Sequence, residues 1–138
     1  MEPRVQAEQD GAARANGRDR WIVRWKIHNL GEAPLSILAA RLPHGKFRSD
    51  EKSIDPPLEI ASGETGRIEI EARCAERPGA EVENAFVILR VTHAGAPWLI
   101  LARLRITVDN DGTPNSATEL ITVQPVGFSE RQASQRRW

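Results

Sequence analysis

Apolar and polar residues alternate along most of this chain with a period of two, which is the pattern of half-buried β-strands. The pattern is clearest over residues 21–28. Four apolar residues there share one side of the predicted strand, and three basic or titratable residues share the other. The apolar side consists of Trp21, Val23, Trp25 and Ile27, and the polar side of Arg24, Lys26 and His28.

The same alternation predicts seven or eight short strands. They cover about residues 5–9, 21–28, 34–41, 58–60, 67–74, 82–93, 98–108 and 119–123. Residues 10–20 and 46–55 are predicted as loops, because they are rich in polar and turn-forming residues. Pro56 and Pro57 exclude a central strand at their position, since proline cannot donate a ladder hydrogen bond. Many short strands separated by turn signals favour an antiparallel β-sandwich.

Two stretches resemble bacterial immunoglobulin-like domains. Residues 23–37, VRWKIHNLGEAPLSI, are similar to the second strand, turn and third strand of those domains. Residues 57–65, PLEIASGET, followed by the strand at 67–74, are similar to their fourth and fifth strands. The resemblance covers about residues 20–108. It implies an immunoglobulin-like antiparallel β-sandwich of seven to eight strands that serves in adhesion, spacing or interaction.

The resemblance also implies which strands are neighbours. The second and fifth strands would lie side by side and contribute Trp21 and Trp25 to the core. Their outer faces would then place three basic or titratable residues beside two acidic ones, in cross-strand pairs that stabilise a sheet. These residues are Arg24, Lys26 and His28, opposite Glu69 and Glu71. The sixth and seventh strands would be adjacent in the other sheet.

Both faces of the sixth and seventh strands are apolar. The longer apolar row on the sixth strand, Val87 to Val91 at every second residue, is expected to face inward. The outward residues then form an apolar patch, and patches of this kind mark contact surfaces. The predicted interface consists of Phe86, Ile88, Leu99, Leu101 and Arg103, with Arg90 and Arg105 also at its rim.

Three occupants of this patch remain open at the level of the sequence. Residues 117–128 of the same chain could cover it, because they supply enough apolar surface. A second copy of the chain or a different protein partner could cover it instead. The apolar residues available for the first alternative are Leu120, Ile121, Val123, Val126 and Phe128.

The turn at residues 43–48 is a second candidate site. It combines an aromatic ring with basic or titratable groups, which suits contact with an anion or a glycan. The candidate ligand residues are His44, Lys46, Phe47 and Arg48. The other interpretation of this stretch is a surface turn before a polar loop.

Composition and charge restrict the function further. A chain of 138 residues with 40% apolar and 28% charged residues fits one globular domain, expected over residues 1–128, with a flexible basic tail at 129–138. Nineteen basic residues balance nineteen acidic ones, which argues against non-specific nucleic-acid binding. Basic residues dominate 1–48 and acidic ones 50–83, so we expect oppositely charged strands to lie side by side.

No catalytic, metal-binding or cofactor-binding motif is found. His28, His44 and His93 lie in separate segments without ligand spacing, and Cys74 is expected to be an inert core thiol. The longest apolar run is too short to cross a membrane, and the first residues do not form a secretory signal, which predicts a cytoplasmic location. The sequence therefore predicts a non-catalytic protein-interaction or structural module. The alternative is a sandwich that binds a small ligand, an anion or a glycan at residues 43–48.

Overall fold

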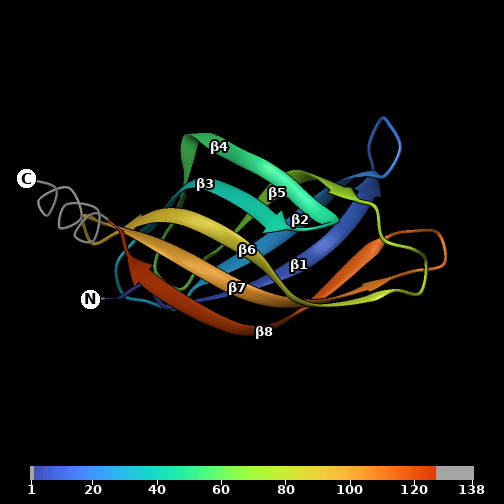
Figure 1. The fold of residues 1–138 in the computed structure, drawn as a ribbon. Coiled ribbons are helices and arrows are strands. Elements are labelled where there is room, and N and C mark those ends of the chain that lie inside the picture. The colour runs from blue at the N-terminus through green and yellow to red at the C-terminus, as the bar shows by residue number, and fades with distance from the viewer. Residues whose placement is uncertain (1, 127–138) are drawn as a thin grey trace, which may run out of the picture.

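Eight antiparallel strands make up the described part of the chain, which is residues 2–126 in a computed structural model, and no helix occurs there (Figure 1). The predicted all-β class is confirmed. The predicted tail at 129–138 lies outside the described residues. The strands are β1 (Val5–Arg14), β2 (Arg20–Asn29), β3 (Leu35–His44), β4 (Phe47–Ile60), β5 (Thr65–Cys74), β6 (Glu81–His93), β7 (Ala96–Val108) and β8 (Pro114–Pro125).

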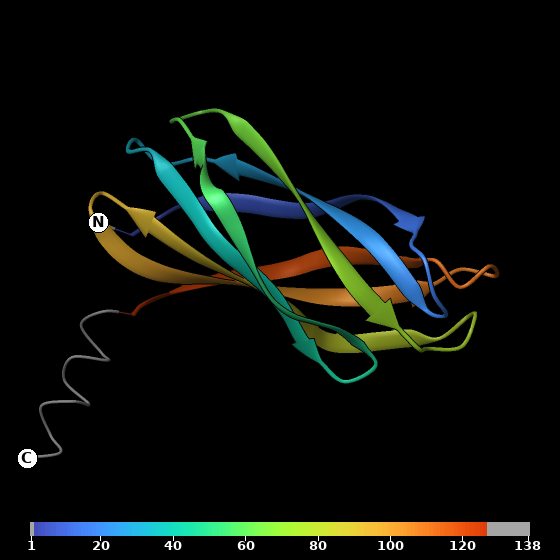
Figure 2. The same cartoon turned by 90° about the horizontal axis from the view of Figure 1, so that it is seen from above.

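All eight strands belong to one sheet in the order β1-β2-β5-β4-β3-β6-β7-β8. The sheet curls until its two edge strands, β1 and β8, come together. Figure 2 shows β3, β4 and β5 crossing over β6, β7 and β8 as a consequence of this curl. The sheet is thus nearly closed into a barrel, with the core between the crossing strands.

Side chains rather than a backbone ladder hold β1 against β8. The Gln9 amide nitrogen donates to the Pro114 carbonyl at 2.8 Å, and the Gln9 amide oxygen accepts from the Ser116 backbone nitrogen at 2.9 Å. The Thr118 hydroxyl donates to the Ala7 carbonyl at 2.7 Å. Closing the edges in this way protects strand edges that could otherwise pair with other chains.

The expected inward faces form the core. Trp21 and Trp25 are 3% and 1% exposed, and Val87, Leu89 and Val91 are buried as assigned. Large aromatic side chains contribute more buried area than any other residue type, so these two tryptophans anchor the β2 side of the core.

The prediction of a polar loop at 46–55 is wrong from residue 47 onward, whereas the short strand predicted at 58–60 is confirmed as the end of β4. These residues belong to β4, which pairs with β3 from Phe47 to Ser53 and again from Leu58 to Ile60. Between those two stretches, residues 54–57 have no register partner on β3 and form a bulge. Pro56 and Pro57 lie in this bulge, so β4 accommodates them without losing ladder hydrogen bonds.

The predicted loop at 10–20 is also shorter than expected. β1 continues to Arg14 through a bulge between Gln9 and Ala12. Gly11 lies in this bulge with φ of 106°, a conformation that glycine adopts without strain. The bulge therefore carries the strand through a segment whose composition suggested a loop.

Candidate functional site

The outward residues of β6 and β7 form a half-buried apolar surface. Ile88 lies directly opposite Leu101, while Phe86 lies opposite Arg103. On the far side of β7, Arg103 lies opposite Leu120 of β8, whose side chain is 48% exposed. We call Phe86, Ile88, Leu99, Leu101 and Leu120 the outer apolar face.

Residues 114–125 do not cover this face. They form β8, which extends the sheet beside β7 and pairs with it from Trp98 to Val108. The inward side chains Ile121 and Val123 pack against the core. Phe128, the other large apolar residue considered for such a cover, lies outside the described residues. The eighth strand, expected at 119–123, thus forms a hairpin with β7, and covering of the outer apolar face by residues 117–125 is not observed.

The charged rim of the outer apolar face is compensated by ion pairs. Arg105 lies 3.3 Å from Glu119 and 3.6 Å from Glu83. Arg103 lies 3.9 Å from Glu119, and Arg90 lies 3.3 Å from Glu51. An apolar centre with a charge-paired rim resembles the anatomy of protein–protein interfaces.

The turn at 43–48 does not hold its four candidate ligand residues together. His44 pairs with Phe47 across a two-residue turn formed by Gly45 and Lys46. Phe47 is fully buried and belongs to the core, so its ring is not available to a surface ligand. His44 is half-buried and Lys46 is exposed at the tip. The prediction of Phe47 as a ligand contact is therefore wrong, because the residue opens a strand instead of a loop.

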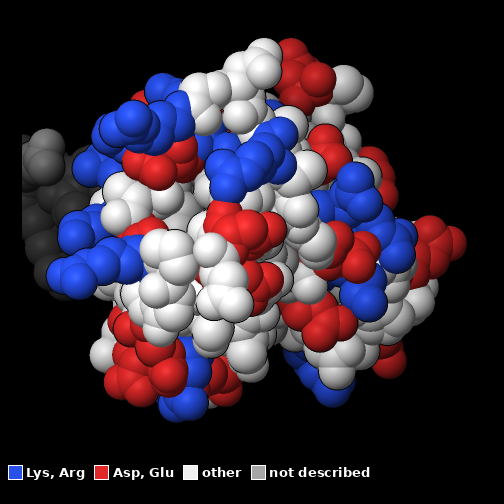
Figure 3. Space-filling model, turned by 90° about the vertical axis from the view of Figure 1, so that its right-hand side faces the viewer, with Lys and Arg blue, Asp and Glu red and all other residues white. Residues whose placement is uncertain are grey.

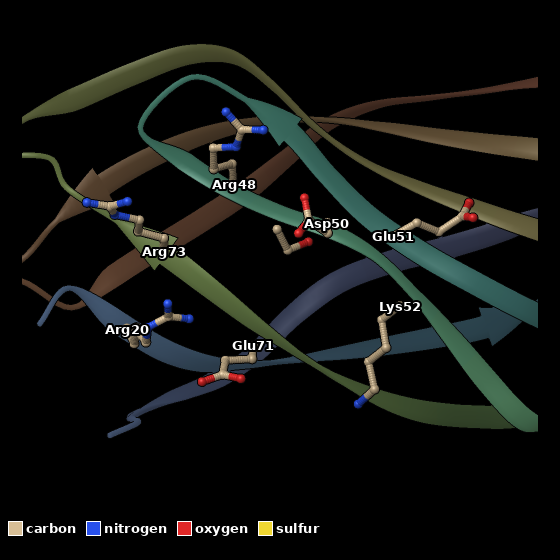
Figure 4. A pocket seen from close by; sticks show the side chains of 8 residues that line it. Arg20, Arg48, Asp50, Glu51, Lys52, Glu71 and Arg73 are labelled. Atoms are coloured by element: carbon tan, nitrogen blue, oxygen red, sulfur yellow. The ribbon is translucent and has the colours of Figure 1, made fainter. Parts of the chain in front are cut away.

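Arg48 has a different setting from the other three candidates. It lines a shallow hollow of about 600 Å³ over β2, β4 and β5 (Figure 4). The side chains of Arg20 and Arg73 line the same hollow from β2 and β5. Sequence reasoning missed this grouping, because the three residues are far apart in the chain. The alternation of apolar and polar residues does not show which residues of distant strands lie opposite each other.

The charged outer face of β2 and β5 is paired only in part as expected. Arg24 forms the expected ion pair with Glu69 at 3.1 Å. Lys26, however, lies 3.3 Å from Glu8 of β1, and His28 Nδ1 lies 2.8 Å from the Thr65 hydroxyl. The register explains the difference, because Lys26 is opposite Arg67 and Glu71 is opposite Ile22.

The residue types considered for chemistry are dispersed in the described structure. Between residues 2 and 126, no three His, Cys, Asp or Glu side chains are placed to hold a metal ion. Cys74 is buried, and desolvation raises the pKa of its thiol above the ordinary value. A raised pKa leaves less of the nucleophilic thiolate near neutral pH, so Cys74 has the setting of a core thiol.

Comparison with known proteins does not place the chain in a family. No family model matches it, and no curated protein matches it. Among solved structures, it is similar to the X-ray structure of the Northeast Structural Genomics Consortium target SoR45, with 14% sequence identity. That match covers 91% of this chain and 86% of the other, with a TM-score of 0.28.

The end of the molecule that carries the loop between β1 and β2 has a mixed charge. Figure 3 shows basic and acidic side chains in adjacent groups over this end, without a field of one sign. This agrees with the equal numbers of basic and acidic residues in the chain. In the described part of the chain, no helix is long and apolar enough to span a membrane.

Proposed function

We propose that the chain is a non-catalytic protein-interaction or structural module that binds through the outer apolar face. The observation that carries this proposal is the Ile88–Leu101 pair, which places two large apolar side chains on the outward side of the sheet. Antiparallel sheets with one face on a core usually carry polar residues on the other face. An apolar outward row therefore calls for a partner that removes it from water.

The proposed fold in finer detail is an immunoglobulin-like β-sandwich. The strand order supports it, because β1, β2 and β5 follow each other as strands A, B and E do in that fold. Likewise β3, β6 and β7 follow each other as strands C, F and G do. β4 and β8 distinguish this chain, since β4 joins the two groups of strands and β8 adds a further strand beside β7.

The partner is a protein surface with a matching apolar patch, either on a different protein or on a second copy of this chain. Paired rim charges favour such a partner over a polyanion, because Arg103 and Arg105 are already engaged with Glu119. A cytoplasmic location stays a prediction.

The experiment that tests this function compares two exposed leucines. Leu120 lies on the outer apolar face and is 48% exposed, whereas Leu30 lies between β2 and β3 and is 41% exposed. Tagged wild-type chain, Leu120→Asp, Leu101→Asp and Leu30→Asp are each used to capture proteins from the native source. Sedimentation velocity of the purified chains measures self-association in parallel.

We expect wild type and Leu30→Asp to capture the same stoichiometric protein, or to form the same dimer. Leu120→Asp and Leu101→Asp should lose it while keeping the circular dichroism of the folded chain. Capture that is unchanged by both substitutions on the outer apolar face would rule out this surface as the interface.

The alternative function, binding of a small ligand, an anion or a glycan at residues 43–48, is weakened by the burial of Phe47. Arg48 is the candidate that keeps an accessible basic group in a hollow. Substitution of His44 by Ala should therefore leave any such binding nearly unchanged, whereas substitution of Arg48 should reduce it.

A further inference from the structure

Three arginines lie in one row across three adjacent strands. Arg73 of β5 is the register partner of Arg20 on β2 and of Arg48 on β4. Directly opposite residues point to the same side of a sheet, and all three side chains are exposed. Strands lie about 4.8 Å apart, so the row extends over roughly 10 Å. Figure 4 shows the three arginines grouped at one end of the hollow, with Asp50, Glu71 and Lys52 farther along it.

None of the three arginines forms an ion pair or a side-chain hydrogen bond with another described residue. Basic groups elsewhere on the same outer face are compensated, at N–O distances of 3.0 to 3.3 Å. These compensated pairs are Arg24–Glu69, Lys26–Glu8 and Arg67–Asp10. The unpaired row is therefore a local departure from the pattern of this sheet.

Like charges directly opposite each other destabilise a sheet. Here two such contacts occur side by side, Arg20 with Arg73 and Arg73 with Arg48. Packing does not require arginine at these positions, because the side chains are exposed. A local loss of stability that the fold does not require is typical of a functional site.

The arginine row lies next to buried core positions. The position next to the Arg48–Arg73 pair is the pair of Phe47 with Cys74, and both of those side chains are buried in the core. The Cys74 backbone nitrogen donates to the Asp19 carbonyl at 2.8 Å, which ties the end of β5 to the loop before β2. Sites built on strands hold their side chains more accurately than sites built on loops.

We propose that the arginine row, Arg20, Arg73 and Arg48, binds the phosphoryl groups of a compact phosphorylated small molecule. Guanidinium groups present several donors in a planar fork that fits phosphate oxygens, and they remain charged at any physiological pH. A row of about 10 Å has room for two linked phosphoryl groups. The site lies on β2, β5 and β4, away from the outer apolar face, and does not depend on the function proposed for that face.

The acidic residues of the hollow favour a compact ligand over a long polyanion. Asp50 and Glu71 are the next outward positions after Arg48 and Arg73 along their strands, and both line the hollow. Their carboxylates would repel further phosphates or sulfates but would accept hydrogen bonds from hydroxyl groups. A phosphorylated sugar has this distribution of charge, with its phosphoryl end on the arginines and its hydroxyls toward Asp50 and Glu71.

The experiment is isothermal titration of the full chain at low ionic strength, where exposed charges are least screened. The probes are inorganic pyrophosphate, a hexose monophosphate and a sulfated polysaccharide. Arg73→Gln and Arg48→Gln remove members of the row. Arg24→Gln is the matched control, because it removes an exposed arginine of the same face that is already paired with Glu69.

We expect pyrophosphate and the hexose monophosphate to bind wild type and Arg24→Gln similarly. Binding to Arg73→Gln should be weaker by roughly tenfold or more, since hydrogen bonds between charged groups are among the strong ones. Equal losses in Arg24→Gln and Arg73→Gln, or no binding of either small probe to wild type, would overturn the proposal. Preference for the sulfated polysaccharide would overturn the choice of a compact ligand.

Thermal unfolding separates this proposal from a structural role of the row. Without ligand, Arg73→Gln should unfold at the temperature of wild type or higher, because the substitution removes repulsion from both neighbouring arginines. Pyrophosphate should raise the unfolding temperature of wild type but not that of Arg73→Gln. A clearly lower unfolding temperature for Arg73→Gln alone would assign the row to stability and contradict a binding role.

Discussion

Phe47, at the hairpin between β3 and β4, is a core residue and not a ligand contact. Its neighbours Lys46 and Arg48 are both exposed, so the local sequence around it is typical of a surface turn. The ring nevertheless points inward, opposite Cys74 of β5, and is fully buried. Burial of a large aromatic at the start of a strand fixes where β4 begins.

Substitution of Phe47 by Ala should lower the free energy of unfolding by about 3–5 kcal/mol, as expected for loss of a buried aromatic and the resulting cavity. His44→Ala, at the half-buried position opposite, should change it by less than about 1 kcal/mol. Urea unfolding followed by tryptophan fluorescence measures both values. Similar small effects of the two substitutions would contradict a core role for Phe47.

Side-chain burial was predictable where alternation is regular. Trp21 and Trp25 lie on a strand with four apolar residues at every second position, and both are buried. Phe47 could not be predicted in this way, because β4 is mostly exposed between its two buried ends. Its burial depends on the neighbouring strands β3 and β5. The hairpin joins β3 directly to β4, but Cys74 of β5, which lies opposite Phe47, is distant in sequence.

Among the elements, β1 and β8 are held together by one side chain above all. The Gln9 amide bonds to the backbone of Pro114 and to both the backbone nitrogen and the hydroxyl of Ser116. It thereby replaces part of the ladder that would close a complete barrel. The bulge that follows Gln9 in β1 shifts the strand at this point.

Gln9→Ala should lower the free energy of unfolding by about 1–3 kcal/mol, because partly buried backbone groups of β8 lose their partners. It should also increase amide hydrogen exchange in β8 more than in β6. Gln6→Ala, at an exposed position of the same strand, provides the matched control. Exchange in β8 that is identical in wild type and Gln9→Ala would show that other contacts hold the two edges together.

For β4, the sequence did not indicate whether its polar segment forms a loop or a strand. The prolines at 56 and 57 do exclude ladder bonds locally, as expected from their chemistry. They do not end the strand, because residues 54–57 leave the ladder as a bulge and β4 pairs with β3 on both sides of it. Whether a polar segment becomes a loop or a strand depends here on a neighbour that supplies partners.

Across the whole molecule, two aspartates have a lowered pKa because they accept side-chain hydrogen bonds. Asp10 of β1 accepts a hydrogen bond from Arg67 of β5, and this bond lowers the pKa of the Asp10 carboxyl below its usual range. Asp111 accepts from the hydroxyl of Thr113, which lowers the pKa of Asp111 in the same direction. The folded state therefore holds both carboxylates in their charged form.

A carboxyl whose pKa is lower in the folded state adds stability above its unfolded pKa, which is about 3.9 for Asp. This stability is lost as the pH falls below about 4 toward the folded value. Thermal unfolding between neutral pH and pH about 2.5 should show the loss in wild type. It should show a smaller loss in Asp10→Asn and Asp111→Asn. Identical acid profiles for wild type and both variants would mean that other carboxyls cause the loss.

The two proposed surfaces lie on different groups of strands and can be tested separately. The outer apolar face belongs to β6, β7 and β8, whereas the arginine row belongs to β2, β5 and β4. Leu120→Asp should leave pyrophosphate binding unchanged, and Arg73→Gln should leave capture of a protein partner unchanged. Loss of both activities in either variant would indicate a general effect on folding.

The strands and their inward faces are properties of the chain taken locally, because a side-chain period of two is built into extended backbone. Trp21, Trp25 and the row from Val87 to Val91 were assigned correctly on this basis. Register is not local, since it depends on bulges and on pairing between distant strands. Only the tertiary structure therefore placed Arg20, Arg73 and Arg48 in one row, brought β1 against β8 and placed Phe47 in the core.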